Sequence, residues 1–175
     1  MSDTDVKVMQ KFVDTLVGIP RFSYPAKRNA PRPKGEFAHI KLLDEYQIGV
    51  PSYYAKNETA ETTDRVILSP TLLRFRVGIV ETNGIASTKI MHGWTTEVIK
   101  SLMITTGYGF VKAEPIGLED AKLETQWEPR QALSIELNTT RVFKEVVDNI
   151  TGMTISGEVS EGEELHHLLI DVNNN

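Results

Sequence analysis

Residues 72–111 constrain the fold of this chain more than any other segment, because they read as a strand, a polar turn, an amphipathic helix and a second strand. Apolar and polar residues alternate in the first strand, as expected for a half-buried strand. Its apolar face carries Leu73, Phe75, Val77 and Ile79, and its other face carries Arg74 and Arg76. The helix is predicted over residues 85–105, ends before Gly107, and has an apolar side made of Ile90, Met91, Trp94, Val98 and Leu102. These patterns describe a scaffold and carry no reaction chemistry.

The whole chain has 175 residues, which is enough for one domain with a sizeable core. It contains no cysteine, which excludes disulfides, thiolate chemistry and cysteine-based zinc sites. A formal net charge of −5 argues against a dedicated nucleic-acid binder, whose surface is usually basic. The N-terminus has no basic region followed by an apolar run, and no apolar stretch approaches about 18 residues. We therefore expect neither secretion nor a membrane span.

The remaining patterns complete an α+β fold. A helix is predicted over residues 4–17, followed by strands over residues 36–46, 65–80, 109–116 and 131–142 and by a closing hairpin over residues 151–158 and 165–172. Residues 118–126 are expected to form a turn or a short helix. We expect residues 1–175 to form a single domain with a mostly antiparallel sheet flanked by two main helices. The core of the sheet is expected to comprise Ile40, Leu42, Phe75, Val77, Ile79, Leu133, Ile135, Leu137, Leu168 and Ile170.

Three segments differ in character from these elements. Residues 23–35, here called the basic arm, are rich in proline, which resists helices and central strands. The basic residues of this arm are Lys27, Arg28, Arg32 and Lys34. Residues 49–64 are predicted to be a polar loop, and a loop of this length is usually functional or mobile. Residues 158–164, here called the acidic connection, contain Glu158, Glu161, Glu163 and Glu164.

Each of these charged groups has a functional interpretation and a simpler one. The basic arm could grip a neighbouring subunit or another partner, or it could be a solvated loop. Arg74 and Arg76 could line an interface or could lie on an exposed sheet face. The acidic connection could meet a basic partner, could line a channel, or could only keep the chain soluble.

A search for catalytic and ligand-binding patterns identifies no residues that would carry chemistry. The histidines have no ligand partners at the spacing of a metal site. They are His39, His92, His166 and His167. Residues 107–112 begin like a dinucleotide-binding loop, but Lys112 occupies the third glycine position and a strand follows, so they read as a helix end and a turn. We therefore expect no catalytic residue, no cofactor and no bound metal.

The order of the elements resembles that of the phage tail terminator proteins, also called neck terminators. That pattern has an N-terminal helix, a stretch leading into a strand, a long strand running into an amphipathic helix, and closing strands. The matching segments here are residues 4–17, 27–35, 36–42, 72–80, 85–105, 131–142 and 165–172. Gly93 interrupts the amphipathic helix at a cost of about 1 kcal/mol relative to alanine. A close contact between helix and sheet at Gly93 would explain its presence.

The resemblance implies a non-enzymatic structural protein of the virion tail or neck, assembled in the host cytoplasm. It implies a ring, expected to be hexameric, that caps the tail tube, stops its polymerisation and joins it to the head connector. The implied partners are further copies of the chain, the tail tube protein and the head–tail connector protein. A sheath protein stays open as a partner, no membrane is involved, and DNA would only pass through the channel. The alternatives are another head–tail joining or tube component and a small phage hydrolase or nuclease.

A closed ring needs head-to-tail contacts between two different surface patches. The basic arm, the strand arginines and the acidic connection would supply patches of opposite charge. The candidate interface residues are therefore Lys27, Arg28, Arg32, Lys34, Arg74, Arg76, Glu158, Glu161, Glu163 and Glu164.

Overall fold

The computed structural model describes residues 3–26, 33–58, 62–80, 83–118, 121–123, 126–128, 130–148, 152–161 and 164–173. The chain divides into two compact units, which we describe separately. The first unit is Met1–Val50 with Ser69–Arg141, and the second is Pro51–Leu68 with Val142–Asn175. The assignment of the whole chain to one domain stays a prediction.

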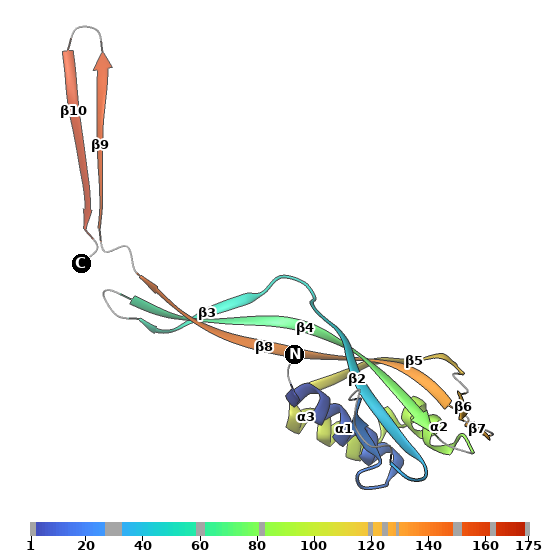
Figure 1. The fold of residues 1–175 in the computed structure, drawn as a ribbon. Coiled ribbons are helices and arrows are strands. Elements are labelled where there is room, and N and C mark those ends of the chain that lie inside the picture. Colours follow the sequence, from blue (N-terminus) through green and yellow to red (C-terminus); the bar gives the residue numbers. More distant parts are fainter. Residues whose placement is uncertain are drawn as a thin grey trace. The chain divides into compact units, whose positions relative to one another are not determined.

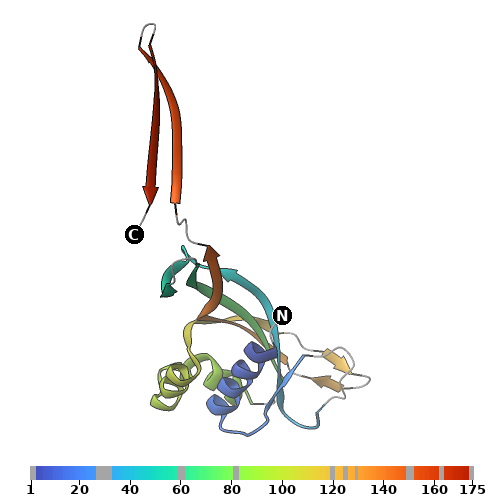
Figure 2. The same cartoon turned by 90° about the vertical axis from the view of Figure 1, so that its left-hand side faces the viewer.

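The first unit is built on most of a sheet that has six strands among the described residues. Five of these strands form its main path: β1 (Ser23–Pro25), β2 (Phe37–Gln47), β4 (Thr62–Val80), β5 (Tyr108–Leu118) and β8 (Arg130–Asp148). Their order across the sheet is β1-β2-β4-β8-β5. The β2–β4 and β5–β8 pairs are antiparallel, whereas β1 lies parallel to β2. Helices α1 (Asp3–Val17), α2 (Ile85–His92) and α3 (Glu97–Thr106) lie on one side of this sheet (Figures 1 and 2). The predicted α+β class with a mostly antiparallel sheet is confirmed.

The core of the first unit forms between these helices and one sheet face. The predicted alternation holds, because Phe75, Val77 and Ile79 on β4 are fully buried, as are Ile135 and Leu137 on β8. Helix α1 contributes Val6, Met9, Phe12, Val13 and Val17 to the same cluster. Every second residue of the central strands therefore faces the helices, which leaves the intervening residues to the opposite face.

The second predicted helix is broken, and this changes which residues it buries. Helix α2 ends at His92, the 3₁₀ turn η1 (Gly93–Thr95) follows, and α3 starts at Glu97. The break shifts the helical phase, so the prediction that Val98 is buried is wrong; Val98 is 66% exposed and Ile99 is buried instead. A Cβ on Gly93 would lie 2.6 Å from Leu16 Cδ2, so the close contact at this glycine is with α1, not with the sheet.

The second unit contains strands where a loop was predicted. Strand β3 (Ser52–Glu58) pairs antiparallel with the first part of β4, for example Tyr53 opposite Ile67. The prediction of a polar loop over residues 49–64 is therefore wrong, because aromatic and β-branched residues there favour strand pairing. Nη1 of Arg65 lies 4.0 Å from Oε2 of Glu145 on β8. The guanidinium carbon of Arg65 lies 4.8 Å from the ring centroid of Tyr53. These contacts join β3, β4 and β8 side by side.

The C-terminal hairpin forms, but it does not close the main sheet. Strands β9 (Gly152–Glu161) and β10 (Glu164–Asn173) pair antiparallel in a separate two-stranded sheet, so the prediction that Leu168 and Ile170 belong to the main sheet is wrong. Strands β6 (Ala121–Leu123) and β7 (Gln126–Glu128) also pair only with each other among the described strands. They replace the turn or short helix predicted over residues 118–126.

Residues 23–26 and 33–35 of the basic arm belong to the described part of the chain. The first residues of the arm form β1, an edge strand, which is the one sheet position where Pro25 is readily tolerated. Within the described residues, no helix is long and apolar enough to cross a membrane.

Candidate functional site

The sheet face that the helices leave uncovered carries a row of paired charges, here called the charged sheet face. Arg74 on β4 lies between Asp44 on β2 and Glu136 on β8. Its Nε donates to Glu136 Oε1 at 2.9 Å, and its Nη1 lies 3.4 Å from Asp44 Oδ2. Lys112 on β5 stands opposite Glu136 in the register and places its Nζ 3.7 Å from the same Glu136 oxygen. One carboxylate is thus shared by cations from the strands on both sides.

Contacts within this row raise the pKa values of its two cations, Arg74 and Lys112. Glu136 is only 7% exposed at its side chain, and burying a carboxylate is costly unless charged or hydrogen-bonded partners surround it. The hydrogen bond to Glu136 raises the pKa of Arg74 above its usual value. The hydrogen bond to Glu114 likewise raises the pKa of Lys112. The cations therefore stay charged around neutral pH, and this surface suits charge recognition better than proton transfer.

A second polar network ties the N-terminal helix to the sheet. Asp5 on α1 is fully buried, and its Oδ1 accepts a hydrogen bond of 2.6 Å from the Tyr108 hydroxyl. Its Oδ2 accepts a hydrogen bond of 2.8 Å from Arg141 Nη2, while Arg141 Nε donates to Glu45 Oε1 at 2.8 Å. The hydrogen bond to Asp5 raises the pKa of Arg141. The network therefore fixes α1 against β2, β5 and β8.

Burial, together with the hydrogen bond to Asp5, raises the pKa of Tyr108 from 10.0 to about 12. Between these values the folded chain holds a proton that the unfolded chain has lost, so the stability contributed by Tyr108 is complete below pH 10 and falls as pH rises toward 12. We expect Tyr108→Phe to cost about 1–2 kcal/mol at pH 9. The difference between wild type and variant should shrink as pH approaches 12. Urea unfolding of both proteins at several pH values measures it, and a difference that does not change with pH would contradict this assignment.

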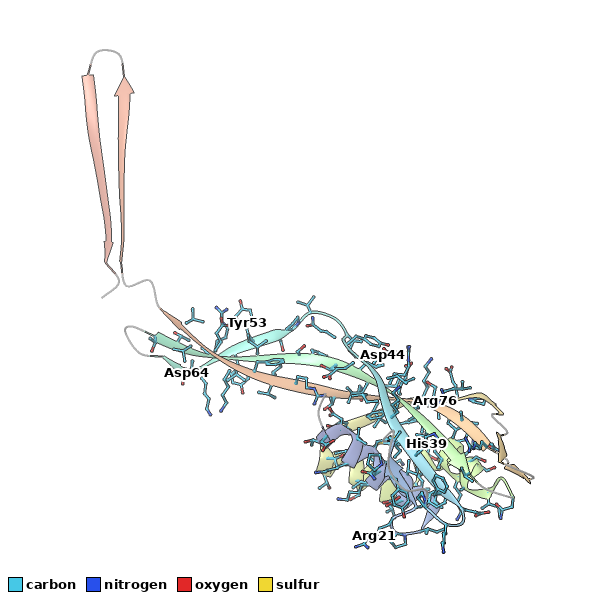
Figure 3. The ribbon with its side chains drawn as sticks, viewed as in Figure 1. Arg21, His39, Asp44, Tyr53, Asp64 and Arg76 are labelled. Atoms are coloured by element: carbon cyan, nitrogen blue, oxygen red, sulfur yellow. The ribbon has the colours of Figure 1, made fainter. Side chains whose placement is uncertain are left out.

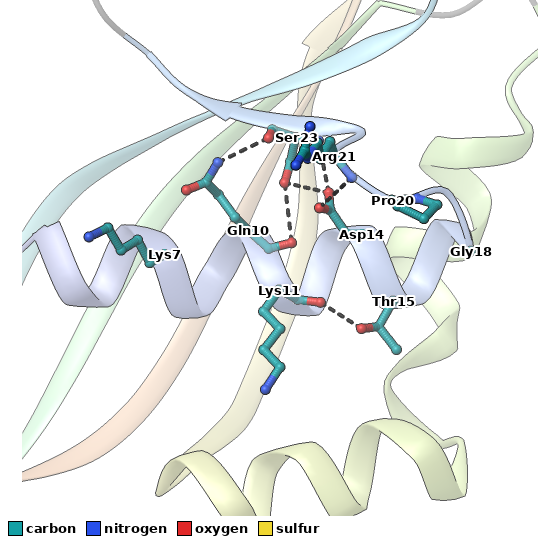
Figure 4. A pocket seen from close by; sticks show the side chains of 9 residues that line it. All are labelled: Lys7, Gln10, Lys11, Asp14, Thr15, Gly18, Pro20, Arg21 and Ser23. Carbon is teal, nitrogen blue, oxygen red and sulfur yellow. Dashed lines mark hydrogen bonds between the residues drawn. The ribbon is translucent and has the colours of Figure 1, made fainter.

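A hollow lies beside the end of α1, next to the start of the basic arm (Figure 4). Asp14 organises it: its Oδ1 accepts from the Ser23 backbone N–H at 2.8 Å and from the Ser23 hydroxyl at 2.6 Å. Its Oδ2 accepts from the Arg21 N–H at 3.0 Å, which holds Arg21 in the left-handed conformation with φ 58°. Lys7, Lys11 and Arg21 line the hollow and give it a positive charge.

The structure places the predicted interface residues in three regions. Arg74 and Arg76 lie on β4, and Arg76 stands opposite Lys41 in the register (Figure 3). Lys34 is exposed in the bend before β2. Glu158 and Glu161 belong to β9 and Glu164 to β10, and the register sets Glu161 opposite Glu164. Lys27, Arg28, Arg32 and Glu163 lie outside the described residues.

The four histidines lie on three elements, β2, α2 and β10. The ring of His39 on β2 lies against Gly78, where an added Cβ would come within 2.2 Å of it. His92 is exposed at the end of α2, whereas His166 and His167 stand opposite Val159 and Glu158 in the register. The described part of the chain contains no group of three or more His, Asp or Glu residues that could hold a metal ion.

Sequence reasoning missed the network around Asp5. Its ion pair joins residues 136 positions apart, and no local pattern encodes such a contact. One signal was available, because Asp5 lies one helical turn before the buried Met9 and so falls on the apolar side of α1. A carboxylate in that position predicts a buried cationic or hydroxyl partner.

A helix-covered sheet whose other face carries paired charged groups suits a protein that acts through its contact surfaces. A family model described as phage neck terminator protein matches residues 6–163. The chain therefore belongs to the phage neck terminator family and is a structural component of the head–tail region of a virion. The resemblance seen in the sequence is thereby confirmed. A comparison with curated proteins gives no match.

Proposed function

We propose that this chain assembles into a hexameric ring that caps the phage tail tube, stops its polymerisation and joins it to the head connector. The family match over residues 6–163 carries the proposal. The chain acts without catalysis, and its partners are further copies of itself, the tail tube protein and the connector protein.

The distribution of charge supports a head-to-tail ring. The hollow beside α1 gathers Lys7, Lys11 and Arg21 next to the basic arm. The acidic connection brings Glu161 opposite Glu164 across a strand pair, where like charges are unfavourable unless a cation is near. A closed ring uses two unlike patches of one chain, and these two patches have complementary charge.

A tube-length assay tests the capping function. Tail tube protein is polymerised with and without this chain, and the products are viewed by electron microscopy. We expect rings of the chain alone and, with it, shorter tubes that end in a ring. Incorporation along the tube wall would instead identify a tube component, and tubes of unchanged length without rings would contradict the proposal.

The charged patches predict a salt dependence of assembly. If the acidic connection of one copy meets the basic arm of the next, the oligomer should dissociate as salt rises. At about 1 M salt the Debye length falls to about 3 Å, which removes most of the attraction. Each exposed pair contributes only about 0–1 kcal/mol, so several must act together. Light scattering at low and high salt measures the change in mass.

A matched variant separates this arrangement from its alternative. The variant changes the four glutamates of the acidic connection, Glu158, Glu161, Glu163 and Glu164, to glutamine. If these glutamates bind the basic arm of the next copy, the variant should lower the oligomer mass, as high salt would. If these glutamates instead face one another in a central channel, salt and the substitutions should both strengthen the ring. A mass unaffected by either change would contradict both arrangements and leave the acidic connection as a solubility feature.

A further inference from the structure

The C-terminal hairpin lacks what a stable two-stranded sheet needs. Strands β9 and β10 pair over ten residue positions and, among the described strands, with no other strand. The register aligns Met153 with Val172 and Ile155 with Ile170. Because residues alternate between faces, Val159 and Leu168 fall on the same face as these four. An isolated hairpin with one apolar face is marginal in water and needs a further strand or layer.

The second unit also offers an edge that fits such a hairpin. Strand β5 accompanies β8 only as far as Thr139, so within the second unit, from Val142 to Asp148, the described strands leave that edge of β8 open. The edge displays large apolar side chains: Val142, Phe143 and Val146 are 58%, 56% and 67% exposed. An unpaired strand edge of this length with apolar side chains is a template for strand addition.

We propose that the β9–β10 hairpin of one copy adds to the open β8 edge of the next copy. The added strand would pair with the backbone groups along this edge, over residues 142–148, and would cover Val142 and Val146 with apolar residues of the hairpin. This inference deepens the proposed ring and rests on it, because it names the contact that links successive copies. Hairpin and edge are two different patches, so the contact propagates head to tail and can close into a ring.

The strand pairing favours a second copy over the chain's own hairpin as the occupant of this edge. Only residues 149–151 separate β8 from β9, a length that would allow β9 to turn back along its own β8. The described strands nevertheless pair β9 with β10 alone, in a separate two-stranded sheet. Each copy therefore presents both an unfilled edge and an unpaired hairpin, and one neighbour satisfies both.

Cross-linking tests the contact cleanly, because the chain contains no cysteine. Val146→Cys on the β8 edge is combined in one chain with Ile155→Cys on β9 or with Ile170→Cys on β10. Ile155 and Ile170 are register partners on the apolar face of the hairpin, so both of its strands are sampled. A short bismaleimide also reaches diagonal neighbours about 7–8 Å apart. Val98→Cys, on the exposed side of α3, replaces Val146→Cys in the control.

We expect the edge-and-hairpin variants to give a ladder of covalent multimers on a denaturing gel, and the Val98 control to give only monomer. Mixing the two single-cysteine variants should give cross-linked dimers that contain one copy of each. A cross-link within one chain would overturn the proposal, since the hairpin would then fill its own edge. Rings by light scattering without interchain cross-links would overturn it and leave the proposed function standing. Covalent chains that never reach a closed mass would overturn only the ring.

Discussion

Replacing Trp94 with alanine should lower the free energy of unfolding by about 3–5 kcal/mol. Trp94 is 3% exposed and stacks on Phe110 with ring centroids 4.5 Å apart, while Phe12 of α1 lies 5.6 Å from it. Its indole N–H donates to the Ile90 carbonyl at 2.5 Å. Alanine would leave a cavity where η1 joins helix α1 to strand β5. Urea unfolding followed by circular dichroism measures the loss.

Val98→Ala is the matched control for this substitution. Val98 follows Trp94 by one helical turn in the sequence but is 66% exposed, so its replacement should change stability by no more than about 0.5 kcal/mol. If Trp94→Ala and Val98→Ala lowered the free energy of unfolding by similar amounts, the inference that the helical phase shifts at Gly93 would be wrong. A loss below about 1 kcal/mol for Trp94→Ala would mean that the indole does not fill the core as described.

Arg141→Met should lower the free energy of unfolding by about 3 kcal/mol. The substitution leaves the fully buried Asp5 carboxylate with only the Tyr108 hydroxyl as a partner. Breaking one side of a buried ion pair usually costs about 3–5 kcal/mol. We expect the lower end of this range, because the Arg141 side chain is 26% exposed and water can reach it. Urea unfolding at neutral pH provides the measurement.

A double substitution separates the buried charge from lost packing. Asp5→Leu combined with Arg141→Met removes the carboxylate as well, so it should recover at least about 1 kcal/mol relative to Arg141→Met alone. Lys100→Met serves as the comparison, since its ion pair with Glu97 is exposed and contributes only about 0.2–0.5 kcal/mol. A double variant less stable than Arg141→Met would show that Asp5 does not need its cation.

The long-range polar contacts could not be predicted from local patterns in the sequence. Asp5, Glu45, Tyr108 and Arg141 come from four separate elements, and only the folded sheet brings them together. Glu136 stands on the outward side of β8, as its alternation predicts, yet it is buried because the longer side chains of Arg74 and Lys112 flank it. Alternation therefore identified the correct face of the strand but not the burial of this residue.

The wrong secondary-structure predictions share a physical cause. Residues 49–64 look like a loop because they are polar, but pairing with β4 gives them a strand partner that the local pattern does not reveal. A single helix over residues 85–105 fits the apolar spacing, but Gly93 lets η1 interrupt it, and the next buried residue becomes Ile99. A glycine indicates where a helix can break, but it does not determine how far the helical phase shifts across the break.

The sequence alone determined the α+β class, the buried face of β4 and β8, the position of α1 and the end of α3 at Gly107. These features depend on local periodicity and on helix-ending residues, which neighbouring positions encode. Tertiary structure decided which strands pair, which charged groups are buried and which edges stay open. Those depend on contacts between residues far apart in the chain, such as Asp5 with Arg141, and their energies exist only once the sheet has brought the partners together.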